Sequence, residues 1–273
     1  MFDLVTENSF DLNKTKEYHL SIQVNLDGFS FFIVNPKENQ LVAFRHETLR
    51  ISNEAFVARR ASEWMEEQEI FTHPYKRVQL VHWSKQFALV PQGWTNEGSK
   101  SVLQLLYHDK IKDNILVNHL SDFHKSLIFT MPAQLQEFIK KKFPECFIYH
   151  PLKKISGNLP ELHSNSGHGL VLAVSPENFY LLIYSKSDIL LMNHYRFSHA
   201  NDVVYYVLSV LKQLGISPKR TELLLSGVIK KEDKIKEMLE PHFYSTNYLS
   251  PITSIHFNTL WFDGTEHRFL TLY

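Results

Sequence analysis

GLVLAVSPENFYLLIYSKSDILLMNHY, residues 169–195, is an apolar stretch that short polar pairs interrupt twice. The interruptions are Pro176-Glu177 and Lys186-Ser187, and proline and serine favour tight turns. We therefore predict three consecutive strands, each apolar enough to be covered by other parts of the chain: Gly169–Ser175, Phe179–Ser185 and Asp188–Tyr195.

The segment after these strands, Ala200–Leu214, contains the run Val203–Val207, which also suits a strand. Its length of about four turns favours a helix instead. Ser198 or Asn201 offers an N-terminal cap, and Gly215 offers a stop. This region therefore predicts three antiparallel strands followed by a helix.

An earlier part of the chain repeats this pattern. A shift of 150 residues aligns Leu20–Val34 with Leu170–Tyr184 without a gap. Three strands and a helix with an apolar stripe at Val57, Ala61 and Trp64 are predicted there as well. The match favours an internal duplication, although two unrelated buried hairpins could also produce it. The predicted strands are His19–Asn25, Phe29–Asn35 and Gln40–His46, and the identical aligned pairs are Leu20/Leu170, Val24/Val174, Phe29/Phe179 and Ile33/Ile183.

A further strand follows each of the two helices, at Lys76–Ser84 and at Thr221–Gly227. A strand, a helix and a strand in this order imply a crossover connection and parallel pairing. Residues 86–163 fit the duplication less well. The strands predicted there are Phe87–Pro91, Asn114–Leu120, Ser126–Met131 and Phe147–His150, and the helices are Asn96–Tyr107 and Ala133–Phe143.

Two lobes, residues 1–163 and 164–273, are expected from this layout. Ser164–Gly169 reads as a linker between them, and residues 1–17 read as a loosely held lead-in. In the second lobe we predict a helix, a strand and a terminal helix, at Lys231–Leu239, Phe243–Tyr248 and His267–Tyr273.

Composition excludes several classes of protein. The formal net charge is zero, so nothing in it favours binding to nucleic acid or to anionic lipid. A single cysteine, Cys146, rules out an intramolecular disulfide and suits a reducing compartment. The sequence shows neither a signal peptide nor an apolar run of membrane-spanning length. A cytoplasmic protein without membrane insertion is the expectation.

Several stretches carry a resemblance to known proteins. Two copies of three strands, helix, strand, helix and strand resemble the duplicated RNase H-like fold of actin-like ATPases. More narrowly, the chain is similar to a bacterial family of unknown function with that fold, which has no established activity. It also resembles the cytoplasmic actin-like modules of pilus and secretion assemblies, which act largely as scaffolds. The stretches are YHLSIQVNLDGFSF (18–31), FALVP (87–91), IFTMPAQLQEFIKKKFP (128–144), LLLSGVI (223–229) and EHRFLTL (266–272).

The resemblance to actin-like ATPases implies three nucleotide contacts that can be checked against this sequence. In the first hairpin turn, Asp27-Gly28 could reach a metal ion and phosphate, but it is equally typical of a plain hairpin turn. In the second, Pro176 has no N–H and Glu177 would repel phosphate. Ser226-Gly227 stands where those ATPases bind adenosine, with one glycine in place of a pair. A hydrolytic phosphate clamp is therefore not expected.

Other reactive side chains form no recognisable motif. Three histidine pairs are each spaced by five residues, which is neither helical nor same-face strand spacing, so we predict no metal site. Cys146 has no base paired with it by motif and reads as a core thiol. Lys140–Lys142 reads as the solvated face of a helix. The histidine pairs are His119/His124, His163/His168 and His194/His199.

The sequence thus predicts an α/β protein with a two-lobed actin-like architecture, built from two RNase H-like units and degenerate as an ATPase. We expect a non-catalytic binding or scaffold protein with a protein partner and no cofactor, and homo-oligomer formation is left open. The alternative is a protein that binds ATP or ADP through degenerate phosphate loops. No catalytic, cofactor-binding or metal-binding residue is assigned.

Overall fold

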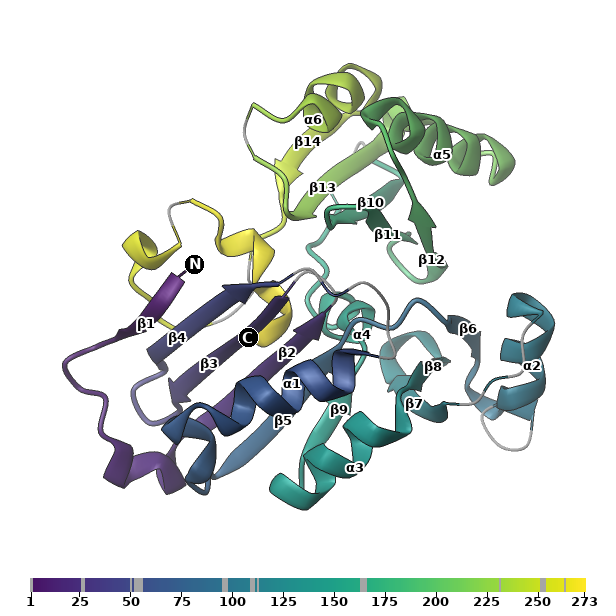
Figure 1. Cartoon of the computed structure of the whole chain (residues 1–273). Helices are drawn as coiled ribbons and strands as arrows, with labels where there is room; N and C mark the ends of the chain where they lie inside the picture. Colours follow the sequence, from purple (N-terminus) through teal and green to yellow (C-terminus); the bar gives the residue numbers. More distant parts are fainter. Residues whose placement is uncertain are drawn as a thin grey trace.

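The part of the chain that the structure describes forms three β-sheets with helices packed against them (Figure 1). The structure is a computed structural model. It describes residues 2–25, 28–49, 51, 56–94, 98–108, 111, 113–162, 166–230, 232–250, 254–262 and 264–273.

The first sheet has six strands in the order β1-β4-β3-β2-β5-β9. Strands β2, β3 and β4 are antiparallel neighbours, whereas β5 and β9 are added in parallel. The parallel pairing of β2 with β5 confirms the crossover that the sequence predicts. The strands are β1 (Phe2–Thr6), β2 (His19–Asn25), β3 (Gly28–Asn35), β4 (Gln40–Thr48), β5 (Arg77–His82) and β9 (Phe147–Tyr149).

The second sheet repeats this order with five strands, β12-β11-β10-β13-β14. Three antiparallel strands are again followed by two parallel ones. The predicted strand Thr221–Gly227 is found unchanged as β13. The other strands are β10 (His168–Val174), β11 (Asn178–Tyr184), β12 (Ile189–Arg196) and β14 (Ser245–Tyr248).

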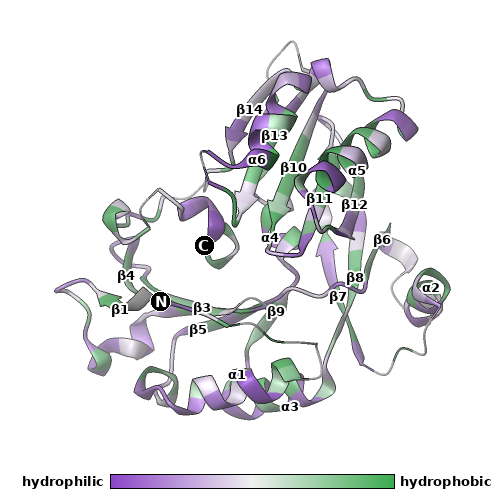
Figure 2. Ribbon diagram, turned by 45° about the horizontal axis from the view of Figure 1, so that its top comes forward, coloured by the Kyte–Doolittle hydropathy of each residue, from purple (hydrophilic) through white to green (hydrophobic). Residues whose placement is uncertain are grey.

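Helices cover one face of each large sheet. On the first sheet, α1 (Val57–Glu66) and α3 (Ala133–Lys142) pack against the core cluster that contains Leu20 and Ile33. On the second sheet, α5 (Ala200–Gln213) and α6 (Lys234–Leu239) do the same. Figure 2 shows hydrophilic and hydrophobic residues alternating along these helices, as expected where one face is buried. Each sheet with its helices is called a lobe below.

Residues 86–163 depart from the duplication because they contain an additional unit. It is a three-stranded antiparallel sheet, in the order β6-β8-β7, with one helix packed beside β6. We call it the inserted subdomain, and it lies between β5 and α3 in the chain. Its elements are β6 (Phe87–Pro91), α2 (Gly98–Tyr107), β7 (Asn114–Leu120) and β8 (Lys125–Met131); the short helix α4 (Pro151–Ser156) follows β9.

The N-terminal lead-in predicted from the sequence is wrong. Strand β1 extends the first sheet by pairing with β4, and a 3₁₀ turn at Leu12–Glu17 follows it. β1 has only five residues of mixed polarity, and this pattern is too weak to predict that they pair with the edge of a sheet. The hydrogen bonds of the β4 edge, rather than local hydrophobicity, hold this segment.

The linker prediction is also only partly right. Residues 163–165 lie outside the described residues, but Ser166 is buried and donates a hydrogen bond to the Glu222 carboxylate. His168 and Gly169 already belong to β10. The division of the chain at residue 163 stays a prediction.

Two further expectations need correction. Neither Ser198 nor Asn201 caps α5; the Asp202 carboxylate accepts hydrogen bonds from the backbone N–H groups of Ser198 and His199 instead. The terminal helix at His267–Tyr273 is replaced by two 3₁₀ turns, Glu266–Arg268 and Leu270–Leu272. The residues after 254 leave the second lobe and pack on the first sheet. We call residues 254–273 the C-terminal segment.

Candidate functional site

The first hairpin turn joins β2 to β3, with Asn25 paired to Gly28. Asp27 lies outside the described residues. Gly28 has φ +148°, and a Cβ atom there would collide with the carbonyl oxygen of Glu47 on β4. Glycine is therefore required by the close approach of a neighbouring strand, which is a structural reason that needs no ligand.

The second hairpin turn uses its polar groups within the turn itself. The Ser175 backbone N–H and hydroxyl both donate to the Asn178 carbonyl oxygen, at 2.8 and 3.0 Å. The Glu177 carboxylate lies 3.6 Å from Arg196 Nη2, in an exposed ion pair. This turn presents a carboxylate and a proline where a phosphate site needs converging N–H donors.

The end of β13, at Ser226 and Gly227, is covered by the C-terminal segment. The Ser226 hydroxyl donates to the His267 carbonyl oxygen at 2.7 Å. The His267 ring nitrogen Nε2 lies 2.9 Å from the Ile229 carbonyl oxygen, so this ring carries its proton on Nε2, and its centroid lies 4.5 Å from that of Tyr248. His267 is buried and occupies the space next to the end of the strand.

Gly227 is required by the backbone, as Gly28 is. Its φ is +85°, and a Cβ atom would collide with the Val174 carbonyl oxygen, which accepts a hydrogen bond from the Val228 N–H at 2.7 Å. Both glycines singled out from the sequence therefore serve strand contacts.

From β13 the C-terminal segment continues onto the first sheet. The Thr271 hydroxyl donates to Gln23 Oε1 at 2.6 Å, and Gln79 Nε2 lies 3.4 Å from the Leu272 carbonyl oxygen. Gln79 also donates to the Ser21 hydroxyl at 2.7 Å. These groups are buried. One short segment thus forms buried hydrogen bonds to both lobes, and Figure 1 shows it lying between them in yellow.

Aromatic packing anchors the same segment. Phe262 and Phe269 are both fully buried, and the ring centroid of each lies 4.9 Å from that of Phe44 on β4. Phe32 and Leu272 belong to the same cluster. Burying a phenylalanine side chain is worth about 1.5–3 kcal/mol, so these contacts hold the segment firmly.

A family model matches residues 7–245, and it is described as "Protein of unknown function (DUF3822)". The chain belongs to the DUF3822 family. This agrees with the resemblance to a bacterial family of unknown function that the sequence motifs indicate.

Solved structures confirm the fold of this DUF3822 protein. A protein from Bacteroides thetaiotaomicron VPI-5482, with an actin-like ATPase fold and unknown function, is similar at 23% identity with a TM-score of 0.78; the match covers 91% of this chain and 96% of that one. The structure of a PilM–PilN type IV pilus biogenesis complex is similar at 12% identity with a TM-score of 0.57, over 93% and 96%. No curated protein matches. The two-lobed actin-like architecture is thus shown.

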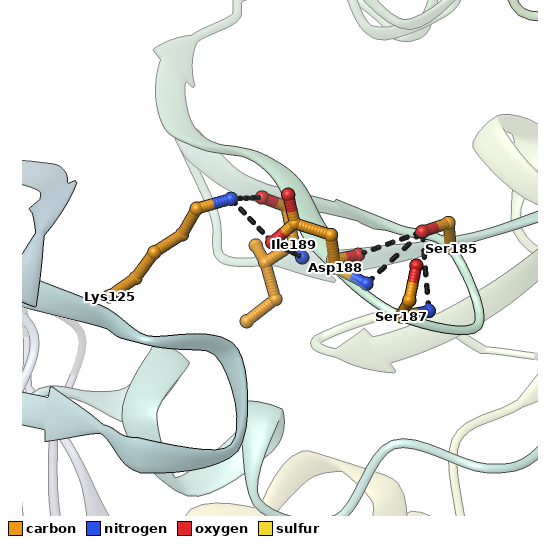
Figure 3. Close-up of polar contacts among 5 residues, drawn as sticks. All are labelled: Lys125, Ser185, Ser187, Asp188 and Ile189. Carbon is orange, nitrogen blue, oxygen red and sulfur yellow. Dashed lines mark hydrogen bonds and ion pairs between the residues drawn. The ribbon is translucent and has the colours of Figure 1, made fainter.

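A second contact that holds the second lobe of the DUF3822 protein lies away from the C-terminal segment and comes from the inserted subdomain. Lys125, at the start of β8, reaches the turn between β11 and β12 (Figure 3). Its ammonium nitrogen lies 2.5 Å from the Asp188 carboxylate and 2.6 Å from the Ile189 carbonyl oxygen. Ser185 Oγ accepts a hydrogen bond from the Asp188 N–H at 3.1 Å, which fixes the turn. The inserted subdomain therefore holds the second lobe from the side.

Buried histidines lie at the same junction. His150 Nε2 lies 3.0 Å from the Ser84 carbonyl oxygen, and its Nδ1 accepts from the Leu152 N–H at 3.2 Å, so the ring is neutral with its proton on Nε2. Burial lowers the pKa of His150 to about 3 and that of His82 to about 4. His194 nearby has its pKa lowered to about 4, by burial first and by Lys85.

The histidine pairs singled out from the sequence are only partly covered by the structure. His119 Nδ1 lies 3.0 Å from the Ser126 hydroxyl, and His163 lies outside the described residues. Within the described part of the chain, no group of three His, Cys, Asp or Glu residues could hold a metal ion. Burial raises the pKa of Cys146 to about 12, so its thiol stays protonated at neutral pH.

Sequence reasoning missed the importance of the C-terminal segment for this site. Gln23 and Gln79 are polar residues at inward positions of two buried strands, and such residues need hydrogen-bond partners. That was the available signal, although it could not identify the partner.

None of the helices in the described residues is long and apolar enough to cross a membrane.

Proposed function

We propose that this protein is a non-catalytic binding or scaffold protein, in which the space between the lobes serves structure and not nucleotide chemistry. The observation that carries the proposal is the C-terminal segment, which forms hydrogen bonds to Ser226 of one lobe and to Gln23 of the other. A nucleotide at the end of β13 would have to displace the buried His267.

The two hairpin turns support the same conclusion. Phosphoryl transfer depends on positioned donors and charge neutralisation, and loss of one oriented donor typically costs roughly 10²- to 10³-fold in rate. The second turn offers Pro176, which has no N–H, and Glu177, which carries a negative charge. Gly28 and Gly227 meet neighbouring backbone where a phosphate-binding glycine would meet a ligand.

A protein partner has a precedent in this fold, since one of the similar structures is the PilM–PilN complex. For the chain described here we propose a protein partner and a cytoplasmic location, the latter because Cys146 is a free thiol.

A thermal-shift titration with ATP, ADP and Mg²⁺ tests the proposal. A nucleotide at 100 times its Kd would stabilise the protein by roughly 2.7 kcal/mol, so even modest affinity would be seen. We expect no shift, and no Mg²⁺-dependent ATP hydrolysis above a buffer blank. Hydrolysis that disappears in Asp27→Ala, with the fold intact by circular dichroism, would overturn the proposal in favour of a nucleotide-binding protein.

A further inference from the structure

A groove of about 730 Å³ lies at the end of the first sheet where β5 and β9 begin. It is formed by the loop that leads into β5 and by the end of α3 with the loop that follows it, and it is separate from the buried hydrogen bonds between the lobes. Grooves of this size accept ligands of several residues or of drug size. Its apolar lining includes Phe71, Pro74, Tyr75, Val78, Phe143 and Phe147.

The charge of the groove is mainly positive. Lys76, Arg77 and Lys142 line it, with Glu145 as the only carboxylate among the lining residues. Within the described residues, neither Arg77 nor Lys142 forms an ion pair with a carboxylate. Lys76 contributes to the lowered pKa of Glu17, so its charge is partly compensated. Arg77 and Lys142 are therefore the cations available to an anionic ligand.

Aromatic rings extend this surface along β9. Phe147 is 50% exposed, and the Arg77 guanidinium lies 4.9 Å from its ring centroid. The Tyr149 ring is nearly parallel to that of Phe147, with centroids 6.4 Å apart. The Lys154 ammonium lies 5.6 Å from the Tyr149 centroid but donates a hydrogen bond to Gln79 Oε1 at 3.3 Å, so it belongs to the buried contacts between the lobes. Arg77 Nη2 also lies 3.5 Å from the Tyr149 hydroxyl, and no carboxylate among the described residues pairs with it. A large exposed aromatic side chain beside such an arginine is the composition of a protein-binding hot spot.

We propose that this groove binds an extended acidic segment of a partner protein, with a carboxylate on Arg77 and a large apolar side chain against Phe147 and Phe143. A single small anion would use Arg77 alone, whereas Lys142 lines the same groove and the aromatic rings continue from Phe147 to Tyr149, which matches a chain of several residues. This inference rests on the proposed function as a binding protein and specifies the chemistry of its partner.

Panning a random heptapeptide library against the full chain tests the proposal. We expect the enriched peptides to combine Asp or Glu with Phe, Leu or Trp. Arg77→Glu and Lys142→Glu should each weaken their binding about 10-fold or more in fluorescence anisotropy, because a reversed charge repels the ligand carboxylate. Added salt should weaken binding to the unaltered protein, since exposed charges are screened.

Lys212→Glu, at an exposed position near the end of α5, is the matched control and should leave affinity unchanged. Enrichment of basic or uncharged peptides, no enrichment at all, or peptides that bind Arg77→Glu as tightly as the unaltered chain would overturn the proposal. The nucleotide titration is independent of this result. A chain that binds ATP yet selects acidic peptides through Arg77 would refute the proposed absence of nucleotide binding and leave the groove assignment standing.

Discussion

The first hairpin has the same strand register in the two lobes, but only one of its two buried faces carries the same kinds of side chain in both. Leu20 pairs with Ile33 in the first lobe, and Leu170 pairs with Ile183 in the second, at positions 150 residues apart. All four identical aligned pairs belong to the clusters that the helices cover. The sequence match between the two halves of the chain therefore comes from residues on the helix-covered faces.

The opposite faces have diverged. In the first lobe this face carries Ser21 and Gln23 beside Phe32, and the C-terminal segment covers it through hydrogen bonds and rings. In the second lobe the matching positions are Val171, Ala173 and Leu182, which pack against the inserted subdomain and α4.

Each of these faces is therefore matched to the part of the chain that covers it. A segment that brings hydroxyl and carbonyl groups against the sheet needs polar partners there, whereas a cover made of apolar side chains alone needs none.

Removing an aromatic anchor of the C-terminal segment should have the largest effect on stability. Phe269→Ala should reduce the free energy of unfolding by about 3–5 kcal/mol, because the ring is fully buried against Phe44. Urea denaturation measures this. Leu260→Ala, in the same segment but 86% exposed, should change it by less than about 0.5 kcal/mol. Equal effects of the two substitutions would mean that the segment is not packed on the sheet.

The helix-covered faces should respond alike. Ile33→Ala and Ile183→Ala should each cost about 2–5 kcal/mol, since both side chains are completely buried in equivalent strands. Chemical denaturation of the two variants gives the comparison directly. A cost below about 0.5 kcal/mol at either site would contradict the equivalence of the hairpins.

The region where the inserted subdomain and α4 pack on the second lobe should be sensitive to acid. Burial lowers the pKa values of His150 and His82 to about 3 and about 4, whereas an unfolded histidine titrates near 6.5. Between about pH 6.5 and pH 4 the unfolded chain binds protons that the folded chain does not. The free energy of unfolding should therefore decrease as the pH is lowered, by up to about 1.4 kcal/mol per pH unit for each of these histidines.

Denaturation at several pH values measures this slope, and His150→Gln should reduce it. An unchanged slope in that variant would show that His150 titrates normally in the folded protein.

The hydrogen bond between the C-terminal segment and Gln23 should give the smallest effect on stability. Thr271→Val or Gln23→Met removes one partner of a buried hydrogen bond and should cost about 1–3 kcal/mol. The double substitution should cost less than the sum of the two, with a coupling of about 0.5–1.5 kcal/mol. Strict additivity in this double-mutant cycle would place the two side chains apart.

Local patterns were enough for most of the fold. The strand β13 and the helix α5 could be predicted because apolar runs of the right length end at glycine and proline. The parallel pairings followed from the crossover order. Strand β1 could not be predicted, since its stability comes from the edge of β4, which is distant in the sequence.

The C-terminal segment shows the same limit more clearly. Phe269, Leu270 and Leu272 follow one another closely and are all buried, and this density suggested a helix. They belong to different clusters. Leu270 lies in the one that joins α4, the inserted subdomain and the second lobe, whereas Phe269 and Leu272 lie in the one on the first sheet. Tight i→i+3 turns achieve this, whereas an α-helix with one buried stripe would not. At the candidate nucleotide positions, the residue types alone argued against a phosphate site in the second turn. That the C-terminal segment covers Ser226 could not be predicted from them.

The path of the C-terminal segment also has a consequence during synthesis. Phe32 and Phe44 lie near the start of the chain, but their cover contains Phe262 and Phe269, which a ribosome adds more than 200 residues later. At roughly 5–20 residues per second, the first sheet would expose this aromatic face for tens of seconds before its cover is made. Nascent chains of this protein should therefore depend on the chaperones that shield apolar surface until translation has passed residue 269.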